Sequence, residues 1–419
     1  MTDSRLGGAL HPQNTKGFVE EFRKSLADKM ARVETAEALM LLNGVREELL
    51  KEISTGKCIS AEIEKLIGKL AAIHVAGELK EARKSFLKLV AELYNMRSSV
   101  DSTFSLAKSF YNRLIAAAFN HALTLLKAEG RGTAPLTFAL LVSGELGRGE
   151  SILGSSSRFF FIYQEPDEAD QDFINELATN FMVLLSLCFP DVSRNLNNPA
   201  TYWFGSDAEW AKTAAELLAV DESDNRGKTK GKSLAPFMET VADMRVVCGD
   251  PDFSKSIMTR CRKLLADYMQ KKHSRHFARD TAIMPVPIGV FGRFKTIRTG
   301  KNRGKIDLKE MAIKPLTAAV RILSLVCGNY ETAFPDRIKS IVDSGNMETA
   351  LANRLLNAFQ DFMRERIRLE LTDGSGVDGF FFNPEDLNEE ARERLRSGFD
   401  SVITLQKLVQ QHLAEVNPE

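Results

Sequence analysis

Apolar residues recur at helical spacing through the first third of the chain. They form three stripes: Phe18, Phe22, Leu26, Met30 and Val33; Phe86, Leu89, Val90, Leu93 and Tyr94; and Phe110, Leu114, Ala117, Ala118 and His121. Pro and Gly are scarce here, so the pattern predicts three to five helices over residues 16–130, packed as a bundle or hairpin. A flexible tail at residues 1–15 would precede them. Such stripes are typical of a core or of a homodimer seam.

The pattern then changes to two short apolar runs separated by glycines. Phe138–Val142 leads into Gly144, Gly147 and Gly149, and Phe159–Tyr163 follows after a polar segment. This order predicts two neighbouring strands of one small sheet joined by a glycine turn, within an α/β domain at residues 131–220. An apolar helix is expected at 173–187, after an acidic connection. Alone, the glycine turn is also consistent with ordinary architecture, because glycine-rich strand ends are common.

The remainder, residues 234–419, is mainly helical in pattern, after a polar and glycine-punctuated segment at 221–232 that predicts a mobile loop. One exception is Pro285–Leu308, whose glycines and alternating basic residues predict a β-hairpin. Its basic residues are Arg293, Lys295, Arg298, Lys301, Arg303 and Lys305. They predict either a patch that attracts phosphate or a solvated hairpin.

Composition narrows the class of protein. The 419 residues include 56 Lys and Arg and 56 Asp and Glu, so the formal net charge is zero. The charge balance therefore gives no indication of nucleic acid as a partner. The five cysteines are scattered without a C-x-x-C pair, which favours reduced thiols over disulfides or a zinc site. No apolar run reaches the roughly 20 residues that span a bilayer, and no signal peptide is visible. We therefore expect a cytoplasmic protein without a membrane partner.

Three later segments carry a resemblance to a known family. They are N-N-P-A-T-Y-W at Asn197–Trp203, M-E-T-V-A-D-M-R-V-V-C-G-D at Met238–Asp250, and the D-L-K, Pro and Arg pattern of Ile306–Leu325. In this order they resemble a nucleotidyltransferase family related to the bacterial PII-uridylyltransferase, and the resemblance covers residues 55–415. Members often carry CBS and cyclic-nucleotide-binding domains, which the first part of this chain is too short and too helical to contain.

The resemblance implies a fold. It would be α+β and mostly helical, with an N-terminal helical region, a small polymerase-β-like nucleotidyltransferase mixed sheet, and a C-terminal helical bundle that helps to bind substrate. It also implies that Met238–Asp250 is a helix. Gly144, Gly147, Arg148 and Glu150 match the turn motif and, with Arg158, are the nucleotide-binding candidates. The C-terminal motif positions of unknown role are Asp243, Arg245, Asp307, Lys309 and Arg321.

The chain departs from the family at the positions of the catalytic residues. Nucleotidyl transfer uses two carboxylates, usually Asp-x-Asp, to hold two divalent cations. Here Ser156 and Arg158 occupy those positions, and Glu145 replaces the Ser that follows the first glycine. A hydroxyl and a cation cannot replace two anionic ligands, and Glu145 would repel a triphosphate. The catalytic site is therefore predicted to be degenerate, with no intact metal ligand set. Two interpretations of Arg158 stay equally open: a fixed positive charge in the place of a metal ion, or a surface residue at the start of a strand.

Three functions stay open at this point. The first is a degenerate nucleotidyltransferase that acts as a nucleotide-binding or regulatory protein, with a nucleotide and a signalling protein as partners. The second is an active, PII-uridylyltransferase-like enzyme that uses Mg²⁺ and a nucleoside triphosphate, with carboxylates supplied by Glu150 or by the acidic segment Glu165–Asp172. The third is an interaction protein that forms a homodimer through its N-terminal helices.

Overall fold

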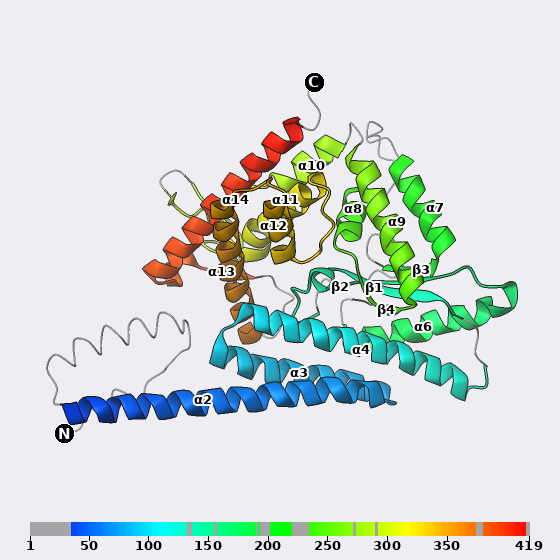
Figure 1. The fold of residues 1–419 in the computed structure, drawn as a ribbon, viewed down its shortest axis with the longest axis horizontal. Coiled ribbons are helices and arrows are strands. Elements are labelled where there is room, and N and C mark those ends of the chain that lie inside the picture. Colours follow the sequence, from blue (N-terminus) through cyan, green and yellow to red (C-terminus); the bar gives the residue numbers. More distant parts are fainter. Residues whose placement is uncertain are drawn as a thin grey trace.

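The structure is a computed structural model and is mostly helical, with one small mixed sheet (Figure 1). It describes residues 35–131, 136–154, 157–189, 192, 202–219, 234–270, 274–289, 292–373 and 380–415. This α+β architecture is the predicted fold class. The predicted tail at residues 1–15, the stripe from Phe18 to Val33 and the predicted loop at 221–232 lie outside the described residues.

Three long helices build the N-terminal region. They are α2 (Thr35–Lys69), α3 (Ala76–Arg97) and α4 (Val100–Ala128). The two predicted stripes within them are core positions, and the rings of Phe86 and Phe110 stack with centroids 4.0 Å apart. The chain turns between α3 and α4 because Ser98 adopts a left-handed conformation and the Ser99 hydroxyl accepts a hydrogen bond from the Ser102 N–H.

The sheet has four strands in the order β3-β2-β1-β4. Strands β1 (Phe138–Gly144) and β2 (Ser157–Tyr163) are antiparallel neighbours, which confirms the predicted strand–turn–strand unit. Strand β3 (Tyr202–Ser206) runs parallel to β2. Both central strands are apolar at nearly every position because helices cover the two faces of the sheet.

Helix α4 and helix α6 (Gln171–Cys188) pack on one face, where the rings of Phe119, Phe161 and Phe181 meet. Helix α6 confirms the apolar helix expected at 173–187. On the other side lie α7 (Asp207–Ala219), α8 (Leu234–Ala242) and α9 (Pro251–Met269), as Figure 1 shows.

The expectation of one helix over Met238–Asp250 is wrong. Helix α8 ends at Ala242, and the chain continues as strand β4 (Arg245–Gly249), which pairs antiparallel with β1. The run Val246, Val247 and Cys248 suits a strand, and the free edge of β1 offers it backbone partners. The sheet therefore reaches beyond residues 131–220, and Asp243 lies at the junction between α8 and β4.

The C-terminal part is a helical bundle. Its helices are α10 (Ser274–Ala282), α11 (Lys314–Val326), α12 (Phe334–Asp343), α13 (Thr349–Asp373) and α14 (Glu389–Glu415). In the segment expected to be a hairpin, Ile288 and Phe294 form an antiparallel bridge. Strand β5 (Ile306–Asp307) pairs with β6 (Phe381–Phe382), which the sequence pattern did not predict. No helix among the described residues is long and apolar enough to cross a membrane.

Candidate functional site

The glycine turn packs directly on the backbone of Asp243. Strand β1 ends at Gly144, which has φ 66°, and the chain makes one helical turn, α5 (Glu145–Arg148), before Gly149 reverses it with φ 73°. A Cβ on Gly147 would lie 1.9 Å from the carbonyl oxygen of Asp243. Only glycine fits at this position, and the reason is packing against α8 and β4.

The Asp243 carboxylate is the centre of a buried ionic cluster. Three guanidiniums donate to it: Arg148 of α5 at 2.5 Å, Arg321 of α11 at 2.8 and 3.0 Å, and Arg337 of α12 at 3.0 Å. Asp243, Arg321 and Arg337 are buried, and the Arg148 side chain is 9% exposed. Burial alone would raise the pKa of Asp243, but Arg321, Arg148 and Arg337 outweigh it and hold the pKa below its ordinary value.

A second buried cluster surrounds Glu145. Arg366 of α13 donates to its carboxylate at 2.5 Å, and the Lys309 ammonium lies 3.7 Å away. Arg366 also donates to Glu370 at 2.8 Å and lies over the ring of Phe380. Burial acts to raise the pKa of Glu145, yet these cations lower it, so the side chain stays charged. The expected repulsion of a phosphate by Glu145 is thus offset by its own counter-ions.

Arg158 begins strand β2 and faces α8. It lies opposite Ser143 in the β1–β2 register, and its guanidinium donates to the Thr240 hydroxyl. Burial lowers the pKa of Arg158, while Glu239 and Asp243 act to raise it. Arg158 is therefore half-buried at the edge of the Asp243 cluster, and its role there stays a prediction.

The remaining nucleotide-binding and motif positions are distributed unevenly. Arg148 also donates to Glu150 at 2.7 Å, which places Glu150 in the cluster, and one Glu150 oxygen has no hydrogen-bond partner. Arg245 donates to the Leu146 and Gly147 carbonyls and so holds the turn against β4.

Asp307 does not join the site, since its carboxylate accepts from the Glu310 N–H at the start of the π-helix Lys309–Ile313. Ser156 lies outside the described residues.

Sequence reasoning missed three members of the site: Thr240, Arg366 and Glu370. One signal was available for the last two. Arg366 and Glu370 are four residues apart, in register with the apolar positions Phe359, Phe362 and Met363 of the same helix. An ion pair on the buried side of a helix indicates a partner on another element.

The side chains around the turn do not fit a divalent cation. Magnesium needs carboxylate oxygens that are available to it. Here Asp243 and Glu145 are bound by arginines, and Arg158 adds a positive charge beside them. Among the described residues, no three His, Cys, Asp or Glu side chains are placed to hold a metal ion.

Two segments of the chain match models of known protein families. Residues 84–224 match a model described as "Putative nucleotidyltransferase DUF294", and residues 271–413 match "Putative nucleotidyltransferase substrate binding domain". The two matches together cover more than half of the chain. The chain belongs to this nucleotidyltransferase family. No curated protein matches the chain.

The family match explains how the cluster is assembled. The glycine turn belongs to the first matched segment, whereas Arg321, Arg337 and Arg366 belong to the second. Asp243 lies in the stretch between them and accepts hydrogen bonds from both. The ionic cluster therefore joins the nucleotidyltransferase segment to the segment described as substrate binding.

Proposed function

We propose that this member of the nucleotidyltransferase family is degenerate and acts as a nucleotide-binding or regulatory protein without metal-dependent transfer. The observation that carries the proposal is the engagement of Asp243 by three guanidiniums. Catalysis with two metals needs anionic ligands at the edge of the sheet. Asp243 and Glu145, two of the acids at this edge, are already neutralised by cations within the protein.

The replacement at position 158 supports the same conclusion. Where the resemblance places the second acid of Asp-x-Asp, Arg158 supplies a cation whose donor group is oriented by Thr240. A guanidinium is a permanent, planar donor that suits a phosphate group. Arg158 could therefore bind an anion at the turn without a metal ion, which is the role we propose for it.

The alternative of an active uridylyltransferase-like enzyme needs carboxylates from elsewhere. The acidic segment Glu165–Asp172 follows the far end of β2, about 20 Å from the turn at the strand rise of an extended chain. Glu150 is the better candidate, because one of its oxygens has no partner. Its other oxygen is held by Arg148, which leaves this carboxylate partly neutralised.

A transfer assay with labelled ATP, GTP, UTP or CTP tests the proposal in the presence of Mg²⁺ or Mn²⁺. We expect no labelled product on a PII-like protein. Calorimetry on the native chain and on Arg158→Ala should show nucleotide binding that chelators leave unchanged and that the substitution weakens. Metal-dependent labelling that is lost in Glu150→Ala would favour the active enzyme instead.

An interaction role has its own supporting observation. The N-terminal half of α2 extends beyond α3 (Figure 1), and Val45 aside, every residue from 42 to 55 is exposed. Leu49, Leu50 and Ile53 are among these exposed apolar side chains. We propose this stretch as the homodimer contact predicted for the N-terminal helices. Light scattering should then show a dimer that Leu49→Glu dissociates, and a monomeric native chain would contradict it.

A further inference from the structure

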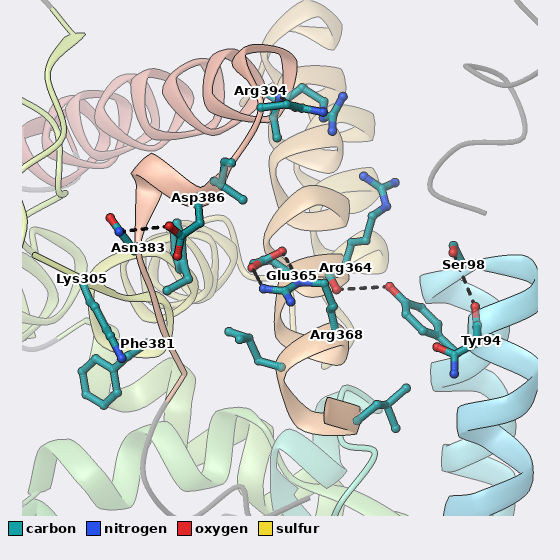
Figure 2. Close-up of a pocket in the computed structure, with 17 residues that line it drawn as sticks. Tyr94, Ser98, Lys305, Arg364, Glu365, Arg368, Phe381, Asn383, Asp386 and Arg394 are labelled. Carbon is teal, nitrogen blue, oxygen red and sulfur yellow. Dashed lines mark hydrogen bonds and ion pairs between the residues drawn. The ribbon is translucent and has the colours of Figure 1, made fainter. Parts of the chain in front are cut away.

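A cavity of about 800 Å³ lies away from the glycine turn, where α3, α13 and the segment from β6 to α14 meet (Figure 2). Its volume falls within the roughly 300–1,000 Å³ of small-molecule sites. The Tyr94 hydroxyl donates to the carbonyl of Arg364 at 3.2 Å, and Gln360 donates to Asp101 at 2.7 Å. These bonds fix α13 to the N-terminal helices and so hold the walls of the cavity in place.

The lining carries an excess of positive charge. Its basic side chains are Lys305, Arg364, Arg368 and Arg394, and its acidic ones are Glu365 and Asp386. Figure 2 shows the arginines on α13 and α14, with Lys305 beside Phe381 on the opposite wall. Cations that surround a concave, partly apolar space attract an anion more strongly than the same charges on a flat surface.

These arginines are held more weakly than those at the glycine turn. Arg368 pairs with Glu365 of the same helix, and Arg394 pairs with Glu390 of its own helix and, at 3.6 Å, with Asp361 of α13. Both arginine side chains are more than a third exposed, so a ligand can reach them from solvent and compete for their donors. At the turn, by contrast, Arg148 and Arg321 are buried against Asp243.

Lys305 is the most informative cation of the cavity. It is half-buried, and among the described residues the structure assigns it no ion pair. Of the six basic residues in the segment that the sequence marked as a phosphate-attracting patch, it is the one that lines the cavity. A half-buried ammonium has lost part of its hydration, so an anion bound beside it would gain a charge-assisted interaction.

Much of the remaining lining is apolar, and its polar members are Asn95, Ser98, Asn383 and Asn388. The rings of Tyr94 and Phe381 and the side chains of Leu369 and Leu387 border the same space. An inorganic anion alone would leave this surface uncovered. A ring attached to the anion would cover it, because aromatic and aliphatic walls bury flat groups.

We propose that this cavity binds a small organic phosphate that carries a flat ring, with Lys305, Arg368 and Arg394 as the phosphate ligands. The site is separate from the glycine turn, and the proposal does not require the function proposed for the turn. The two sites share α13. Arg364 and Arg368 line the cavity. Arg366 lies two residues from each of them, which is a rotation of about 200° around the helix axis, and it reaches Glu145 on the other side.

Calorimetry on the full chain tests the proposal with ATP, with pyrophosphate as the anion alone and with adenosine as the ring alone. We expect ATP to bind more tightly than pyrophosphate and adenosine to bind weakly. Lys305→Gln combined with Arg394→Gln should weaken ATP binding at least about tenfold, since charge-assisted hydrogen bonds are lost. Arg303→Gln is the matched control, because Arg303 is exposed in the same basic segment and does not line the cavity.

Several results would overturn the proposal. ATP binding that Arg303→Gln weakens as much as the cavity variant would indicate non-specific attraction. Binding lost in Arg158→Gln and retained in the cavity variant would place the ligand at the turn, in support of the function proposed there. Absence of ATP and pyrophosphate binding at millimolar concentration would also reject it. Thermal unfolding of each variant checks the fold, and Arg368→Lys, which keeps the charge, should retain pyrophosphate binding.

Discussion

Arg366 of α13 donates to Glu145 of α5 at 2.5 Å, and both side chains are buried. Glu145 belongs to the glycine turn in the first matched segment, and Arg366 belongs to the segment described as substrate binding. The buried carboxylate of the turn is thus matched by a counter-charge on a helix that is distant in sequence.

This relationship predicts a strong energetic coupling. Glu145→Ser should lower the free energy of unfolding by on the order of 3 kcal/mol, because it leaves Arg366 buried with one partner fewer. The double variant Glu145→Ser with Arg366→Met should lose less than the sum of the two single losses, because Arg366→Met alone leaves both Glu145 and Glu370 without this cation. Denaturant unfolding of the two single variants and the double variant gives the coupling energy, and strictly additive effects would contradict the proposed pair.

Asp243 should be more important for stability than any exposed acid. Asp243→Asn removes a charge that three buried guanidiniums share, so we expect a loss of about 3–5 kcal/mol in unfolding free energy. Glu81→Gln is the control, because Glu81 is 65% exposed and pairs with the exposed Lys84. That control should cost less than about 1 kcal/mol. Equal effects in urea unfolding would show that the cluster has no special role.

The pKa of Asp243 also predicts a dependence of stability on pH. Its pKa in the folded protein lies below its ordinary value, so the stabilisation is present above the unfolded pKa of about 4 and is lost as the pH falls below it. The native chain should therefore lose stability steeply in acid, and Asp243→Asn should show a shallower slope. Unfolding curves at a series of acidic pH values measure both slopes, and parallel slopes would reject the linkage.

Gly147 should tolerate no side chain. Gly147→Ala places a Cβ 1.9 Å from the Asp243 carbonyl oxygen, and the backbone of α5 or β4 must move. We expect a loss of about 2 kcal/mol or more in unfolding free energy, as for other overpacked sites. Gly68→Ala in α2 is the control, because nothing lies within 4 Å of its Cβ position. It should be neutral or stabilising by about 0.5–1 kcal/mol, and a similar loss there would contradict the packing argument.

Local patterns were enough to predict much of this fold. The apolar runs before and after the glycines determined β1 and β2, and the stripes around Phe86 and Phe110 determined α3 and α4, because alternation and helical spacing are properties of the chain itself. The turn motif likewise singled out Gly147, Arg148 and Glu150. The resemblance singled out Asp243 and Arg321 as motif positions of unknown role, and only the structure shows that they meet Arg148.

Tertiary structure decided the rest, and the physical reason is the same in each case. Residues 245–249 have a strand-favouring composition, but they form a strand here because the edge of β1 supplies hydrogen-bond partners, and that edge is not visible in the local sequence. Likewise, Arg366 is placed 221 positions from Glu145 in sequence and can be recognised as its counter-ion only when α13 packs against α5. The sequence alone determined which charges this protein carries and which helices and strands its local patterns favour. Only the folded chain decided which charges are neutralised at the turn and which stay exposed to a ligand, because burial and pairing depend on neighbours that are distant in sequence.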